Sequence, residues 1–101
     1  MFSEEFLDNL PTEPRKAAYA MCEEFLKMHK GMLPGEDTVR YEEYVEAFAA
    51  LETFLEAFGL PFAPIELGQE RYPNIQTIVR FFYETKEKLK KVLDDLTLGE
   101  A

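Results

Sequence analysis

Cysteine and histidine are almost absent from this sequence, which has one of each, Cys22 and His29. A single thiol cannot form an intramolecular disulfide, and this pair supplies too few ligands for a zinc site. The two residues are also two turns apart on an expected helix, about 10 Å, which is too far for a nucleophile and its base to share a hydrogen bond. We therefore expect no metal and no Cys–His chemistry, and we interpret His29 as a structural residue near a helix end.

The sequence also lacks the short motifs that carry common enzyme chemistry. It contains no G-x-x-x-x-G-K-[ST], no G-x-G-x-x-G and no G-x-S-x-G. It has no Glu-x-x-His pair of the kind that builds a di-iron site in a helical bundle, because Leu26 stands three residues before His29. We expect no catalytic residue and no cofactor, and hence no enzyme.

Long apolar runs and an excess of basic residues are missing as well. No segment approaches the roughly 20 apolar residues of a membrane span, and the acidic N-terminus does not resemble a secretory signal. The net charge of −9, from 20 acidic and 11 basic residues, disfavours direct binding to nucleic-acid phosphates or to anionic membranes. A lone thiol fits a reducing compartment. These features predict a cytoplasmic protein that contacts neither nucleic acid nor membrane directly.

What the sequence does have is apolar residues at helical spacing. The 101 residues are 47% hydrophobic and 14% aromatic, which predicts one domain over residues 1–101 with its own core. Glycine and proline separate four segments with helical periodicity. Ser3 is the expected cap of a short first helix, Thr12 and Gly31 bound a second, a third runs from about Thr38 to Phe58, and Asn74 caps the last, 75–96. We predict an all-α fold, with three long helices and a short N-terminal helix in an antiparallel-type bundle.

The connection before the last helix is unusual in length and composition. Residues 60–73 exceed the 2–8 residues that commonly join bundle helices. They include Leu60, Phe62, Ile65 and Leu67, which are not ordinary linker residues. We therefore expect this loop to be ordered and to pack on another surface.

The last helix carries a heptad-like pattern, with Ile75, Phe82, Leu89 and Leu96 recurring every seven residues. The same pattern suits one helix of a bundle within the chain or a coiled coil between two chains, and we favour the bundle. Phe81, Phe82 and Tyr83 are consecutive, so one helix face cannot bury all three. Phe82 lies on the heptad side, Phe81 lies at its edge and could be buried with it, and Tyr83 points away. The long loop, the first helix or a second copy of the chain could cover the remaining side.

These aromatic residues suggest a contact surface. The excess of aromatic side chains beside an apolar loop predicts an interaction surface made of Phe62, Ile65, Phe81 and Tyr83. The function that we expect first is a small, non-enzymatic protein–protein interaction module that forms a homodimer.

The acidic residues suggest a second function. Residues 39–60 hold five acidic residues and one basic residue, a net charge of −4. On the side of the third expected helix that faces away from its apolar residues, we predict an acidic ridge of Glu42, Glu46, Glu52 and Glu56. The ridge could be a solvated face, or it could imitate nucleic-acid phosphates and bind a basic protein. A third alternative is a small-ligand binder with a pocket between the helices and the 60–73 loop.

Overall fold

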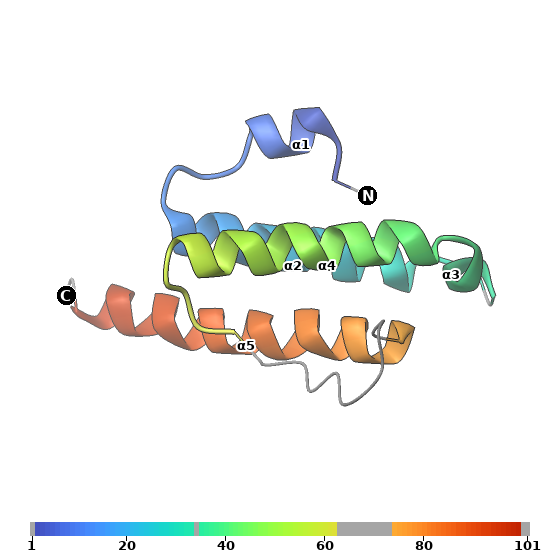
Figure 1. Cartoon of the computed structure of the whole chain (residues 1–101). Coiled ribbons are helices and arrows are strands. Elements are labelled where there is room, and N and C mark those ends of the chain that lie inside the picture. The colour runs from blue at the N-terminus through green and yellow to red at the C-terminus, as the bar shows by residue number, and fades with distance from the viewer. Residues whose placement is uncertain (1, 34, 63–73, 100–101) are drawn as a thin grey trace.

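All the regular secondary structure in the described part of the chain is helical. The computed structural model describes residues 2–33, 35–62 and 74–99, and among these it contains no strand. The helices are α1 (Glu4–Asp8), α2 (Pro14–Lys30), α3 (Glu36–Val39), α4 (Tyr41–Ala57) and α5 (Ile75–Gly99). Figure 1 shows α2, α4 and α5 packed as a bundle, with α1 above α2 and α4. The predicted all-α fold, three long helices and a short N-terminal one, is confirmed.

The directions of the long helices explain the length of the connection before α5. The expected antiparallel arrangement holds for α2 against the other two helices, whereas α4 and α5 run in the same direction (Figure 1). The end of α4 and the start of α5 therefore lie at opposite ends of the bundle. A helix of 17 residues such as α4 is about 25 Å long. At about 3.3 Å per extended residue, at least about eight residues are needed to return along it.

Three of the predicted helix ends are confirmed. The Ser3 side chain accepts a hydrogen bond from the backbone N–H of Phe6 at 3.1 Å, and Gly31 is the C-terminal cap of α2. The Asn74 side chain accepts from the backbone N–H of Thr77 at 2.7 Å. Each cap satisfies a backbone group that has no partner inside its helix.

The predicted cap of α2 is wrong by one residue. Glu13, and not Thr12, caps the helix, because its carboxylate accepts from the backbone N–H of Lys16 at 3.0 Å. The same carboxylate also accepts a hydrogen bond from Arg15 at 2.7 Å. Glutamate is not among the residues favoured at this position, so the sequence gives no local indication that Glu13, rather than Thr12, caps the helix.

The third predicted helix is not continuous. It is divided at Arg40, whose backbone angles, φ −100° and ψ 21°, depart from helical values between α3 and α4. The Arg40 guanidinium lies 3.6 Å from the carboxylate of Glu36 and 4.0 Å from that of Glu43, one on each side of the break. No glycine or proline marks the position, which is why periodicity alone predicted one helix.

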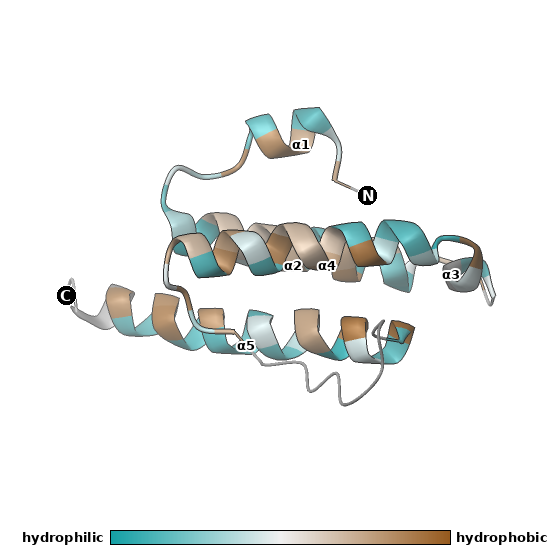
Figure 2. Ribbon diagram, in the orientation of Figure 1, coloured by the Kyte–Doolittle hydropathy of each residue, from teal (hydrophilic) through white to brown (hydrophobic). Residues whose placement is uncertain are grey.

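The core lies between α2, α4 and α5. Phe25 and Phe82 stack with ring centroids 3.8 Å apart, and Tyr44 meets Phe25 edge-on at 5.1 Å. Burying one such side chain fully contributes roughly 1.5–3 kcal/mol. In Figure 2 the hydrophobic residues of α5 lie on its side toward the other two helices. The buried apolar cluster comprises Ala18, Met21, Cys22, Phe25, Tyr44, Ala47, Phe48, Leu51, Leu55, Ile78, Phe81, Phe82 and Leu89.

The heptad-like side of α5 faces this core. Ile78, Phe82, Thr85 and Leu89 are all buried within the chain. Leu96 is 36% exposed near the projecting C-terminal end of α5. Between residues 78 and 89, the interpretation of the pattern as one helix of a bundle is therefore confirmed.

Candidate interaction face

The α4 side of α5 is closed by aromatic residues. Phe81 is only 2% exposed, with its ring centroid 4.9 Å from that of Phe48 and 6.4 Å from that of Phe62. Phe62 is half-buried, and its carbonyl accepts a hydrogen bond from Lys88 Nζ at 3.5 Å. The segment that follows α4 thus covers Phe81. The 60–73 loop was expected to pack on another surface, and Phe62, near its start, does so. Phe81 cannot reach a partner while this cover is in place.

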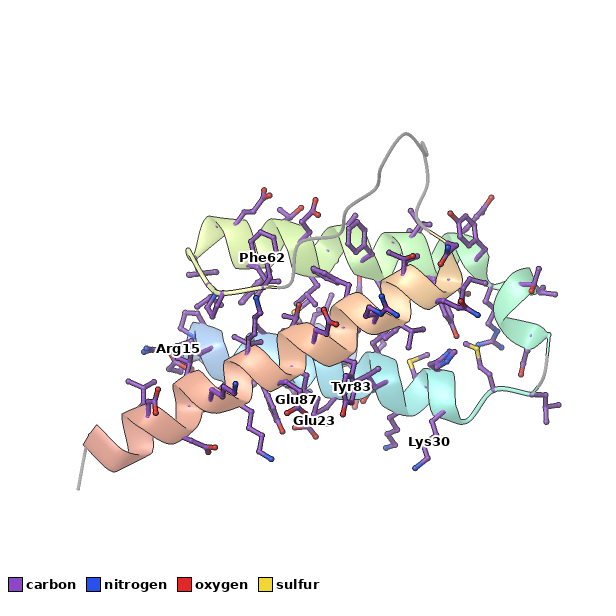
Figure 3. All side chains as sticks on the ribbon, turned by 90° about the horizontal axis from the view of Figure 1, so that it is seen from below. Arg15, Glu23, Lys30, Phe62, Tyr83 and Glu87 are labelled. Carbon is purple, nitrogen blue, oxygen red and sulfur yellow. The ribbon has the colours of Figure 1, made fainter. Side chains whose placement is uncertain are left out.

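Tyr83 lies on the other side of α5. Its side chain is 57% exposed, although it is only two residues from Phe81. Figure 3 shows Phe62 and Tyr83 on opposite sides of the helix. The structure therefore does not join Phe62, Phe81 and Tyr83 into one surface. Ile65, the fourth residue predicted for this surface, lies outside the described residues, as does most of the loop expected to line a ligand pocket.

A groove runs beside Tyr83, where α2 and the first half of α5 pack against each other. Its volume is about 610 Å³. Helix α2 contributes Leu26 and His29, and α5 supplies the remaining walls with both apolar and polar side chains. We call this surface the Tyr83 groove; its lining residues are Leu26, His29, Ile75, Gln76, Val79, Arg80, Tyr83 and Glu84.

His29, one of the lining residues, is held in place by a contact with α4. Its Nδ1 atom lies 2.6 Å from Tyr44 Oη, and the Tyr44 hydroxyl is also 2.9 Å from Met32 Sδ. These contacts tie the last turn of α2 to α4 and hold the imidazole ring in place. They agree with the interpretation of His29 as a structural residue near a helix end.

Among the described residues, the charged side chains near the groove form no ion pairs with one another. Arg80 and Glu84 line it, and Glu23 and Glu87 lie beside Tyr83 in Figure 3. Within the described part of the chain, none of these four takes part in an ion pair. Their charges therefore remain available to a molecule that docks on this face.

A cation also contacts an aromatic ring elsewhere between α2 and α5. Lys86 Nζ lies 5.7 Å from the centroid of the Tyr19 ring, a distance at which a cation is attracted to the ring face. Burial, together with the nearby charges of Glu23 and Glu87, raises the pKa of Tyr19. The phenol thus stays neutral and can pack against apolar groups.

Below the surface the α2–α5 contact is closed. Cys22 is fully buried, and burial raises the pKa of its thiol to about 12. A reactive cysteine needs a lowered pKa and exposure. Cys22 has neither, so its role is to fill the core.

The four glutamates predicted as a ridge lie along α4. Glu42, Glu46 and Glu56 are exposed, and Glu52 is partly buried. Burial and the charge of Glu56 together raise the pKa of Glu52. None of the four pairs with a cation among the residues that the structure describes. A shallow hollow of about 440 Å³ lies at one end, lined by Tyr41, Glu42, Val45 and Glu46.

Sequence reasoning found Tyr83 but missed the residues that surround it. Val79 and Arg80 precede Tyr83 by four and three positions, so helical spacing alone could have placed them beside it. Leu26 could not be found in this way, because its contact with α5 depends on how α2 packs.

Two further findings concern the described residues. No group of three or more His, Cys, Asp or Glu side chains among them could hold a metal ion. None of the described helices is both long enough and apolar enough to cross a membrane. Comparison of the chain with protein-family models, with curated proteins and with solved structures finds no match.

Proposed function

We propose that this protein is a small, non-enzymatic helical module that binds another protein through the Tyr83 groove. The observation that carries the proposal is the exposure of Tyr83 beside Leu26 and Val79, in a bundle that buries Phe25, Phe81 and Phe82. An exposed aromatic ring between apolar walls gains much of its burial only when another surface covers it.

The chemistry of the groove supports a protein as the occupant. Tyrosine and arginine are enriched at protein interfaces and among the residues that dominate binding energy. Tyr83 and Arg80 supply both within one turn of α5. The groove is open and lies between two packed helices, so a partner would meet a preformed surface.

Site-specific photocrosslinking tests this proposal. Tyr83 is replaced by p-benzoylphenylalanine in the cells from which the gene comes, and adducts are sought after irradiation. We expect a discrete adduct from position 83. The same probe at Thr53, an exposed position of α4, a helix that contributes no residue to the groove, should give none.

A second variant connects the adduct to the groove itself. Leu26→Lys in the chain that carries the probe places a charge in the opposite wall and should reduce the yield of adduct. The absence of any adduct at position 83, or an adduct that Leu26→Lys does not affect, would contradict the proposal.

The unpaired glutamates of α4 favour a second candidate, an acidic protein that binds a basic protein in place of nucleic acid. Like charges are crowded on this helix, where Glu56 follows Glu52 by one turn, and burial together with the charge of Glu56 raises the pKa of Glu52. A basic partner would relieve this repulsion.

Salt-dependent capture tests the second candidate. Proteins retained by the immobilised chain should elute as the NaCl concentration rises, and changing Glu42, Glu46, Glu52 and Glu56 to Gln should abolish retention. The control removes four acidic charges elsewhere, by changing Glu4 and Glu5 to Gln and Asp8 and Asp95 to Asn. Equal losses in both variants would show that only net charge matters.

A further inference from the structure

The charges on either side of Tyr83 are arranged in a way that limits which partner can dock. Arg80 precedes Tyr83 by three residues, and Glu87 follows it by four. These spacings put all three side chains on one side of α5, with one opposite charge about one turn away in each direction. Neither Arg80 nor Glu87 takes part in an ion pair with another described residue.

This arrangement is complementary to itself. Homo-oligomers most often form around a two-fold axis, in which the same patch of both subunits meets. If a second α5 lies antiparallel across Tyr83, each Arg80 faces the other copy's Glu87, and the contact occurs twice. In a parallel arrangement Arg80 would face Arg80 and Glu87 would face Glu87, which is repulsive.

We infer that the occupant of the Tyr83 groove is a second copy of this chain, docked with its α5 antiparallel to the first. The two tyrosine rings lie near the axis, and two Arg80–Glu87 pairs flank them. This inference rests on the proposed function, because it names the partner for the same groove.

The apolar and charged parts of this contact have separate tasks. Covering Tyr83, Leu26 and Val79 removes apolar surface from water and drives association. The Arg80–Glu87 pairs lie at the rim, where exposed ion pairs contribute little affinity but select the orientation. The dimer should therefore weaken as salt is added, without being lost.

Charge exchange tests the inference with the full-length chain. The molar mass is measured by light scattering and sedimentation over a concentration series for the wild type, Arg80→Glu and Glu87→Arg. We expect the wild type to form dimers. Each variant should need about tenfold more protein to do so, because charge reversal replaces two attractive contacts with two repulsive ones. Both positions are exposed, and circular dichroism checks that each variant keeps its helices.

The decisive sample is an equal mixture of Arg80→Glu and Glu87→Arg. One chain then has two acidic groups and the other two basic groups, so the antiparallel heterodimer regains both ion pairs. We expect the mixture to dimerise at least as readily as the wild type. Lys16→Glu makes the same charge change as Arg80→Glu on the exposed side of α2, and it should leave dimerisation unchanged.

Other outcomes separate the inference from the proposed function. A wild type that stays monomeric at all concentrations, or a mixture no more dimeric than its components, overturns the inference. A crosslink from position 83 to a different protein would still support the proposed function in that case. If Tyr83→Ser dimerises as readily as the wild type, the groove is not the interface and the inference fails. If Leu26→Lys leaves the adduct at position 83 unchanged, the proposed function is contradicted separately.

Discussion

The two sides of α5 differ sharply although the same short sequence builds them. Phe81 faces α4 and Phe62 and is 2% exposed, whereas Tyr83 faces the edge of α2 and is 57% exposed. Both are aromatic, and both lie within one turn of Phe82 in the core. The difference shows that the fate of an aromatic side chain on a helix depends on what the rest of the chain places beside it.

The cover on the α4 side comes from a segment that follows α4. Phe62 lies against Phe81, and Lys88 donates a hydrogen bond to the Phe62 carbonyl. On the α2 side, Leu26 and Val79 border Tyr83 without enclosing it. One side of α5 is thus part of the core, and the other is available for contact.

The largest expected effect comes from opening the closed side. Phe81→Ala should lower the free energy of unfolding by about 3–5 kcal/mol, because it leaves a cavity between α4 and α5. Urea denaturation measures the loss. Tyr83→Ala is the matched control, and equal losses in the two variants would show that the two sides do not differ.

The thiol beneath the open side should respond to pH. The pKa of Cys22 is raised from 9.0 to about 12, so the folded chain keeps the thiol protonated where the unfolded chain loses its proton. Its contribution to stability is therefore complete below about pH 9 and falls between about pH 9 and 12, by at most about 1.4 kcal/mol per pH unit.

The measurement compares wild type and Cys22→Ala by denaturation at several pH values, because lysines titrate in both proteins and cancel. The stability difference should change in favour of Cys22→Ala as the pH rises. A constant difference would mean that folding does not raise the pKa of Cys22.

Removing the cover itself should have a moderate effect. Phe62→Ala deletes a half-buried ring and its edge-on contact with Phe81, so we expect a loss of about 1–2 kcal/mol. Phe58→Ala is the control, since Phe58 is 53% exposed. If Phe62→Ala costs no more than the control, Phe62 does not hold this side of α5 closed.

The smallest effect on stability is expected on the open side. Tyr83→Ser should change the free energy of unfolding of the monomer by no more than about 0.5 kcal/mol, as for most exposed positions. Dilute protein, below the concentration at which it associates, is needed for this comparison. A loss above about 2 kcal/mol would place Tyr83 in the core and remove the basis for the proposed interface.

The helices of this protein could be predicted to a large extent from local patterns. Ser3, Gly31 and Asn74 cap the helices where the sequence suggested, and Phe82 and Leu89, the two central α5 residues at heptad spacing, face the core. The break at Arg40 was not predictable, because no glycine or proline marks it. The cap at Glu13 was not predictable either, because glutamate rarely caps a helix N-terminus.

The candidate site was predictable only in part. Tyr83 was identified as an aromatic residue that the core face could not bury. Phe62, Phe81 and Tyr83 were expected on one surface. Phe62 instead packs against the buried Phe81, Tyr83 lies on the opposite side of α5 from Phe62, and Ile65 lies outside the described residues. Their positions depend on the direction of α4 and on its return segment, which no local pattern specifies.

The sequence by itself determined where the helices form and which residues are apolar enough for the core, because periodicity and capping act within a few residues of the chain. The tertiary structure decided that α4 and α5 run in the same direction, that Phe62 closes one side of α5, and that Leu26 borders the other. These decisions come from contacts between residues far apart in the sequence. Two neighbouring aromatic residues with equal local preferences therefore end as a core residue and an exposed one.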